Sequence, residues 1–512
     1  MTMGIHWPVD PITGKVSTTK TGKKVWIAAL RPLAEEEEEE EEEGGEDGFN
    51  SEQLQQRAQL LIQKIESMPD KNWRHGYSSI VYEISVLMAY ASGDVALSMA
   101  RSGIDELYNL MDFGSESGCS ISTSVVEGKG SMECRRFRMG APRGKNGEFP
   151  SQLYWTGQLM KDQLNSWASY GCIERDTAEH ASQICDIDDV SSLVDGNVFV
   201  LLGATSELGP YRSLAEMGAT IACVARKGQK MKNLIDEART LPCTLLLPVK
   251  SINLPEHVEE GISEEGESGV ANIAGADLIT DSKEIAEWVS SLHPDRRLVI
   301  VSLAYLDGEK HVRASLGMDL ICKTVCERRR DTALAFIVSP ATAHAINEDA
   351  YVNRLSRLSS TPFWHKALTF SGLALQPQTS WTLFKQPPKL HILNGLANLQ
   401  GPNYALAKTF QQWRAMVART DGYLVSANHG PSTRTVSMTA HSQVSHALEG
   451  MQVFEPLIAF DTLPAKTLMA CLLLWDLSRV ESKANADVSL DHPMELFIEN
   501  SVHGGIWRCP YR

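Results

Sequence analysis

Tyr404 and Lys408 are side chains whose types and spacing could do chemistry. They open an amphipathic stretch that carries Phe410, Trp413 and Met416, which predicts a helix. Residues at i and i+4 share a helix face, so the lysine ammonium would lie beside the phenol and lower its pKa. Such a phenol could protonate a carbonyl oxygen as a hydride arrives, or deprotonate an alcohol in the reverse direction. The pair therefore predicts an acid/base centre that interconverts a carbonyl and a secondary alcohol.

A second segment with a chemical pattern runs from Asn197 to Arg226. An apolar run ends at Gly203, a second glycine follows at Gly209, and a short helical pattern leads into another apolar run. Strand, glycine turn, helix and strand in this order open a nucleotide-binding βαβ unit. Glycines let the backbone approach a pyrophosphate, and the free N–H groups at the helix start attract its charge. Arg226 stands where an acidic residue would select the ribose of NAD, and a cation there suits the 2′-phosphate of NADP.

Both patterns also have plainer interpretations. Glycine turns are common in α/β packing, Tyr404 could be a packing ring, and Lys408 could be a surface cation. The order of the segments favours the chemical interpretation. The pair comes directly after a predicted strand at Leu390–Leu393 and precedes another at Tyr423–Ala427, well downstream of the glycine turn.

Together these segments resemble the short-chain dehydrogenase/reductase family, over roughly Asp195 to Thr435. The turn of that family, TGxxxGxG, is matched at Gly203 and Gly209, whereas Leu202 replaces its threonine and Glu207 its middle glycine. A carboxylate near a pyrophosphate lowers affinity unless it points away, because like charges repel.

The resemblance extends to Asn403, as in ketoreductase domains of polyketide and fatty-acid synthesis, and NHGPSTRT resembles the segment that closes over the nicotinamide. It implies a doubly wound, Rossmann-like parallel sheet of the α/β class and an acyl-type or other small-molecule carbonyl substrate. It also implies NADP as the cofactor, with NAD as the second choice. The implied cofactor contacts come from Gly203, Thr205, Ser206, Leu208, Gly209, Arg226 and Lys408.

The serine with which this family binds the substrate oxygen has no match at the usual spacing. It normally lies thirteen residues before the tyrosine, and that count reaches His391, inside a predicted strand. Asn394 ends that strand, and its amide could donate the same hydrogen bond, so we assign it to the catalytic set with Tyr404 and Lys408. Ser339 and Ser302, which end other predicted strands, are weaker substitutes.

Composition divides the chain into four expected regions. Residues 1–50 are expected to form an arm and an acidic linker, in which Val25–Leu30 could be a short strand and the glutamate run is disordered. Residues 51–190 are expected to be mainly helical, 191–440 to form the Rossmann-like domain, and 441–512 to form a helical C-terminal extension packed on it. The strand at 389–393 gives one strand–helix unit more than the simple six- or seven-strand order contains. The sequence does not show where this unit lies.

Charge and hydropathy exclude some partners. The formal net charge is −16, but Glu35–Glu43, Glu46 and Asp47 supply 11 negative charges and leave −5 elsewhere, which argues against a nucleic-acid partner. No apolar run reaches membrane-spanning length, so no membrane span is expected. Because the first residues lack the apolar core of a secretory signal, we expect a cytoplasmic protein, with organellar targeting left open. No metal site is expected, and the family resemblance implies a homo-oligomer.

Two hypotheses of function follow. The first is an NADP-preferring oxidoreductase that uses Tyr404, Lys408 and Asn394. The second is a catalytically silent relative that kept the nucleotide fold as a binding or scaffold module. The missing serine and Glu207 favour the second hypothesis, and the tyrosine–lysine pair with Arg226 favours the first.

Overall fold

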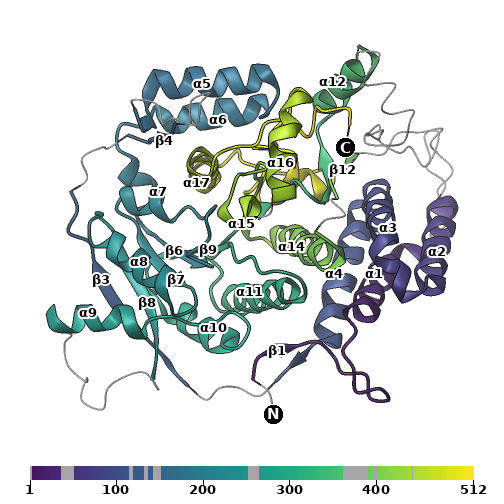
Figure 1. Cartoon of the computed structure of the whole chain (residues 1–512), viewed down its shortest axis with the longest axis horizontal. Coiled ribbons are helices and arrows are strands. Elements are labelled where there is room, and N and C mark those ends of the chain that lie inside the picture. The colour runs from purple at the N-terminus through teal and green to yellow at the C-terminus, as the bar shows by residue number, and fades with distance from the viewer. Residues whose placement is uncertain are drawn as a thin grey trace.

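A computed structural model describes residues 3–35, 51–114, 119–131, 136–141, 152–251, 264–360, 390–396, 400–440 and 442–511. Within these ranges the largest sheet has seven strands in the order β13-β10-β9-β6-β7-β8-β3 (Figure 1). The strands are β3 (Ile121–Glu127), β6 (Asn197–Leu202), β7 (Thr220–Val224), β8 (Thr244–Lys250), β9 (Arg297–Ser302), β10 (Ala333–Val338) and β13 (Leu424–His429). Six strands are parallel and β3 pairs antiparallel with β8 at one edge. The parallel part winds outward in both directions from β6 and β9, an order compatible with a Rossmann-like fold.

Helices cover both faces of this sheet, so its strands are buried and apolar on both sides. Alternation along β6 shows the two layers, because Val198, Val200 and Leu202 face one core and Phe199 and Leu201 face the other. The helices of the first layer include α10 (Ser282–Ser291), α11 (Glu309–Arg328) and α14 (Pro402–Thr420). Those of the second include α6 (Arg175–Cys185), α7 (Tyr211–Glu216), α8 (Gln229–Ala238), α9 (Glu264–Ile273) and α17 (Thr462–Ser478).

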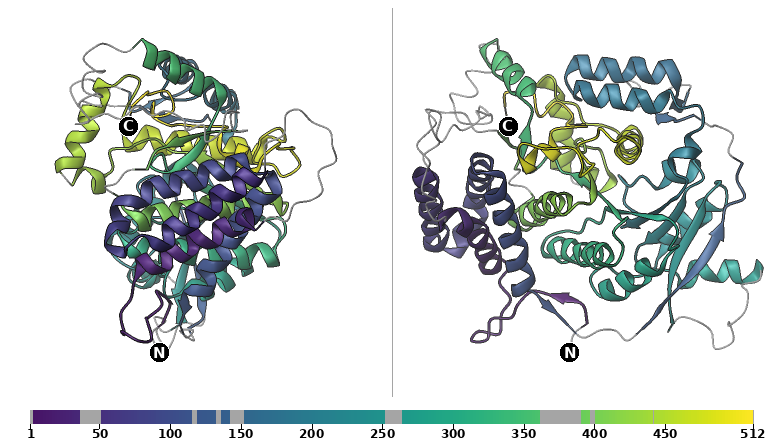
Figure 2. Two further views of the ribbon diagram at one scale, coloured as in Figure 1. Left: turned by 90° about the vertical axis from the view of Figure 1, so that its right-hand side faces the viewer. Right: turned by 180° about the vertical axis from the view of Figure 1, so that it is seen from behind.

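An N-terminal helical region packs on the first layer (Figure 2). It consists of α1 (Thr18–Ala34), α2 (Ser51–Ser67), α3 (Asp70–Tyr90) and α4 (Gly93–Leu110). The Trp26 and Trp413 rings meet edge to face at 5.4 Å and join α1 to α14. Gly103 of α4 makes room for that contact, because a Cβ there would lie 2.3 Å from Cζ3 of Trp413. These helices therefore share one core with the sheet layer.

The structure corrects the expectation of a short strand at Val25–Leu30, which lies inside α1. Trp26, Leu30 and Leu33 are buried at spacings of four and three, the period of a helix. The Ser17 side chain accepts a hydrogen bond from the Lys20 N–H and caps the helix start. The glutamate run from 36 to 43, expected to be disordered, lies outside the described residues.

Short elements complete the region before β6. They are β1 (Ile5–His6), β2 (Asp112–Phe113), β4 (Met139–Gly140), β5 (Tyr154–Trp155), α5 (Gly157–Tyr170) and the 3-10 turn η1 (Val190–Leu193). β1 pairs with β2 and β4 pairs with β5, both outside the seven-stranded sheet. The edge strand β3 comes from a polar, glycine-rich stretch whose composition gives little sign of a strand.

The additional strand unit lies outside the parallel sheet. After β10 the chain forms β11 (Ala343–Ile346) and α12 (Glu348–Ser359), and it returns through β12 (His391–Asn394). β12 pairs antiparallel with β11 in a separate two-stranded sheet. The predicted strand at 389–393 is thus part of an insertion between β10 and α14. Residues 361–389 within it lie outside the described ranges.

The C-terminal part combines helices with an irregular, mostly buried tail. Its elements are α15 (Val436–Thr439), α16 (Ser442–Gly450), α17, and the 3-10 turns η3 (Met451–Val453) and η4 (Pro493–Phe497). No helix in the described ranges combines the length and the apolar character that crossing a membrane requires.

Glu174 holds the tail and the insertion on α6. Its carboxylate accepts hydrogen bonds from Asn347 Nδ2 at 2.8 Å, from His503 Nε2 at 2.9 Å and from two Arg508 nitrogens at 2.7 and 2.9 Å. Burial alone would raise the pKa of Glu174, but His503 and Arg508 outweigh burial and hold this pKa at about 2. The carboxylate is therefore charged and paired at neutral pH.

Replacing Glu174 by glutamine should lower the free energy of unfolding by about 3 kcal/mol, because the mostly buried Arg508 then keeps only the exposed Asp349 as a counter-charge. Glu287→Gln is the matched control: it also removes a bidentate arginine pair, with Arg328, but an exposed one, and should lower the free energy by less than about 1 kcal/mol. Urea unfolding at pH 7 measures both, and equal losses would contradict the structural role of Glu174.

The pH dependence has a fixed sign, because the folded-state pKa of Glu174 lies below its ordinary value of 4.5. The stabilisation from this carboxylate is present above pH 4.5 and is lost as the pH falls toward 2. The difference between the wild type and Glu174→Gln should shrink over that window.

Candidate functional site

The candidate residues gather at the carboxyl edge of the sheet. Gly203 follows β6, Ala304 and Tyr305 follow β9, and Ser339 follows β10. The winding direction reverses between β6 and β9, and ligands of open α/β sheets bind outside the carboxyl ends at such a reversal. Since neighbouring strands lie about 4.8 Å apart, the ends of β6 and β10 lie about 10 Å apart, with β9 between them.

Gly203 is a position where only glycine fits. Its φ is +101°, and a Cβ there would lie 2.7 Å from the backbone nitrogen of Ala304. The N–H groups of Gly203 and Ala204 both donate to the Val224 carbonyl, at 2.9 and 3.0 Å. The glycine therefore lets the loops after β6 and β9 pack backbone to backbone at the reversal point.

The rest of the glycine turn leads into a short helix rather than a long one. Gly209 is buried, with Ser206 O and a Leu303 methyl carbon each 3.2 Å from where its Cβ would be, whereas Thr205, Ser206 and Leu208 are half-buried. α7 has only six residues and follows Pro210, which has no N–H to offer. The N-terminus of α7 therefore offers an anionic ligand fewer free N–H groups and a weaker dipole than the N-terminus of a long helix does.

Glu207, which replaces a family glycine, has a partner of its own. Its carboxylate accepts a hydrogen bond from the Val436 N–H at 2.8 Å. Glu207 is not among the residues with positive φ, so its backbone needs no glycine. The side chain is held on the segment after β13 and joins the glycine turn to it.

Arg226 follows β7 and is available to a ligand. Its side chain is 69% exposed, and its one described ion pair is loose, with Nε 4.0 Å from an Asp277 oxygen. The Ala276 N–H donates to Ala225 O at 2.9 Å, which lays the segment before α10 across the end of β7. A ligand group at this end of β7 would therefore meet Arg226 from the solvent side.

Ser339 and Tyr404 share a hydrogen bond of 2.6 Å between their hydroxyl oxygens. The Ala341 N–H donates to Ser339 Oγ at 3.1 Å and fixes the serine rotamer. Burial raises the pKa of Tyr404, and the bond to Ser339 only partly offsets this. The phenol is therefore protonated at neutral pH, in contrast to the lowered pKa that its spacing from Lys408 suggests.

Lys408 lies one turn further along α14. Its ammonium donates to Gln411 Oε1 at 3.1 Å, and Gln411 Nε2 donates to Ser315 Oγ on α11 at 3.2 Å. Burial lowers the pKa of Lys408 to about 8. Gln411, which is held by Ser315 of α11, thus orients the ammonium. Lys408 is mostly charged at neutral pH, because its pKa lies only slightly above neutral.

Two aromatic side chains that sequence reasoning missed surround the phenol. The ring of His311, in the first turn of α11, stacks on the Tyr404 ring with centroids 5.5 Å apart. Tyr305 contacts both rings edge-on, at 4.9 Å from His311 and 6.1 Å from Tyr404. Their sequence signal is their place, directly after β9 and at the start of the next helix.

Asn394, the assigned oxyanion-side residue, lies at the end of β12 in the insertion. Its amide oxygen accepts a hydrogen bond from the Leu396 N–H at 3.3 Å, and its backbone pairs with Ala343. The hydroxyl that reaches Tyr404 belongs to Ser339 instead. Counting back from the tyrosine missed this serine because the insertion separates the two.

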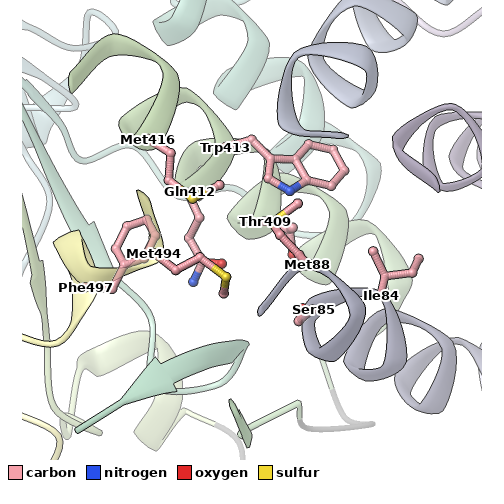
Figure 3. A pocket seen from close by; sticks show the side chains of 9 residues that line it. All are labelled: Ile84, Ser85, Met88, Thr409, Gln412, Trp413, Met416, Met494 and Phe497. Atoms are coloured by element: carbon pink, nitrogen blue, oxygen red, sulfur yellow. The ribbon is translucent and has the colours of Figure 1, made fainter. Parts of the chain in front are cut away.

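A small, mostly apolar cavity lies on another face of α14 (Figure 3). Its lining includes Met88 of α3, Trp413 and Met416 of α14, and Phe497 of η4. It is a packing gap between the helical region and the sheet layer, separate from Tyr404 and Lys408.

Lys408 should titrate with a midpoint near pH 8, because burial disfavours its charged form. The chemical shift of its Cε carbon, followed by NMR in protein labelled at lysine and assigned by the loss of the signal in Lys408→Arg, measures this. A midpoint above pH 10 would contradict the buried placement of the ammonium.

No protein-family model matches this chain, and no curated protein and no solved structure matches it.

Proposed function

We propose that this protein is an NADP(H)-dependent oxidoreductase of the short-chain dehydrogenase/reductase type that interconverts a carbonyl and a secondary alcohol. The observation that carries the proposal is the hydrogen bond of 2.6 Å between Ser339 and Tyr404, at the sheet edge that also carries Gly203. A serine hydroxyl, a phenol and an ammonium on neighbouring elements are the groups that proton transfer to a carbonyl oxygen needs.

Each residue has a role that follows from its surroundings. Tyr404 is the acid/base, because its raised pKa keeps a proton ready for the carbonyl oxygen. Ser339 holds that oxygen through its hydroxyl, and Lys408 holds the ribose. Ser339 takes the role that the sequence assigned to Asn394.

The residues present fit the cofactor in two places. Arg226 is an exposed cation after the second parallel strand, where it suits a 2′-phosphate. Gly203 brings the loops after β6 and β9 together at the winding reversal. When bound, NADPH supplies the hydride; the protein orients the carbonyl and supplies the proton.

A second candidate is a nucleotide-binding or scaffold protein without turnover. The glycine turn favours it, because α7 is short and starts after Pro210, and because Glu207 adds a negative charge to the turn. These features weaken pyrophosphate binding. The intact Ser339–Tyr404 contact favours the enzyme, since a scaffold does not need it.

NADPH should bind at least about 10-fold more tightly than NADH, because a guanidinium pairs strongly with phosphate. Arg226→Ala should remove most of this preference by weakening NADPH alone. Arg101→Ala is the control, because Arg101 also forms an exposed ion pair, with Asp421, on α4 away from the site. Calorimetric titration of the wild type and both variants with each cofactor measures these affinities. Equal weakening of both cofactors by Arg226→Ala would refute the phosphate role, and no binding of either would remove both candidates.

Tyr404→Phe should lower kcat/KM of NADPH-dependent carbonyl reduction by at least about 100-fold, the usual range for a lost general acid. Ser339→Ala should lower it by about 100- to 1,000-fold, as expected for one lost hydrogen-bond donor to the reacting oxygen. Asn394→Ala should change it by less than about 3-fold, because the described hydrogen bond of its amide oxygen is with the Leu396 N–H, whereas Ser339 bonds Tyr404. Steady-state kinetics on a panel of ketones and aldehydes measures this. A larger loss in Asn394→Ala than in Ser339→Ala would reverse the assignment of the serine.

A further inference from the structure

His311 is a buried side chain without a hydrogen-bond partner among the described residues. It is 1% exposed, and neither ring nitrogen has a partner among the residues that the structure describes. Buried polar groups are nearly always hydrogen-bonded, so an exception calls for an explanation.

Two other buried histidines, His344 and His503, do have partners. His344 has Thr342 O at 3.0 Å from Nδ1 and accepts from the Trp507 indole N–H at 3.0 Å. His503 pairs with Glu174 and accepts from the Gly505 N–H at 3.0 Å. His429 also lacks a described partner, but its ring contacts are with His344 and Trp507 rather than with reacting groups.

The surroundings of His311 are those of the proposed reaction. From α14, the Tyr404 ring stacks on it at 5.5 Å, and the Lys408 ammonium acts on it electrostatically. From the loop after β9, Tyr305 contacts it at 4.9 Å, and the Tyr305 hydroxyl donates to Asp307 at 3.0 Å. Burial, followed by the charge of Lys408, lowers the pKa of His311 well below its ordinary value. The imidazole is therefore neutral, with one nitrogen that donates and one that accepts.

Resting on the proposed function, we propose that His311 is a specificity-determining residue that hydrogen-bonds a hydroxyl group of the substrate, which is then a hydroxy ketone. A hydroxyl both donates and accepts, so it can satisfy whichever ring nitrogen faces it, whereas a carbonyl or a carboxylate can only accept. Because the two rings are stacked with centroids 5.5 Å apart, the hydroxyl that binds His311 lies within a few bonds of the reacting carbonyl.

The reaction balances with this hydroxyl unchanged. The keto carbon gains a hydride with its two electrons, and the keto oxygen takes the Tyr404 proton, which gives a diol and NADP⁺. The phenolate regains a proton from water. The substrate hydroxyl keeps its proton and serves only to bind.

Tyr305 is a partly exposed side chain that contacts the buried His311 ring. Its ring is 47% exposed and covers the imidazole from the loop between β9 and α11. For a substrate to reach His311, the Tyr305 ring must turn aside. When no substrate is bound, the Tyr305 ring shields the unpaired imidazole nitrogens.

The test compares 4-hydroxybutan-2-one with pentan-2-one, which has the same number of heavy atoms but a methyl group in place of the hydroxyl. With NADPH, the wild type should have a kcat/KM about 10- to 100-fold higher for the hydroxy ketone. His311→Leu should bring that ratio close to one, while His311→Gln, which keeps a donor and an acceptor, should retain a clear preference.

Each outcome has one meaning. A wild type without preference overturns the role of His311, and no variant needs to fold for this result. Equal losses on both ketones in His311→Leu, with the ratio kept, show a packing role and also overturn it. Turnover of neither ketone nor any other carbonyl defeats the proposed function, and this inference with it. As a further readout, the hydroxy ketone should shift the His311 ring nitrogen resonances, and pentan-2-one should not.

Discussion

The hydrogen bond between Ser339 and Tyr404 is the contact on which the site depends, and it joins residues 65 positions apart. The chain leaves the sheet directly after Ser339 and must return to the same place before α14. Its return is closed by a backbone contact, the Gly395 N–H to Thr342 O at 2.9 Å. Only glycine fits there, because a Cβ on Gly395 would lie 2.1 Å from Pro340 O. The entropy cost of closing a loop rises only slowly with its length. The Gly395–Thr342 contact can therefore close a long insertion without moving Ser339.

The charge states of the site residues follow from the burial of their side chains. Burial raises the pKa of Tyr404 and lowers those of Lys408 and His311, and each shift disfavours the charged form. The result at neutral pH is a neutral phenol, a neutral imidazole and one ammonium. That combination suits proton donation to a carbonyl oxygen, because the acid keeps its proton until negative charge develops on the substrate.

The parallel strands could be predicted because they are buried on both faces and their sequences are continuous apolar runs, such as NVFVLL and LVIVS. The pairing of β12 could not, because a strand sequence does not name its partner. The helix α1 was missed although Trp26, Leu30 and Leu33 have helical spacing, since a short apolar run also fits a strand. Ser339 ranks second from sequence because its spacing from the tyrosine does not match the family, although it ends a predicted strand. The environment of His311 depends on α11, α14 and one loop, which only the fold brings together.

The central claim is that the glycine turn and the Ser339–Tyr404 pair serve one dinucleotide. A crystal structure of the protein with NADP⁺ tests it most directly. We expect the pyrophosphate beside residues 203–209, the 2′-phosphate on Arg226, and the nicotinamide ring next to the Tyr404 hydroxyl. A dinucleotide bound elsewhere, or bound with its nicotinamide away from Tyr404, would contradict it.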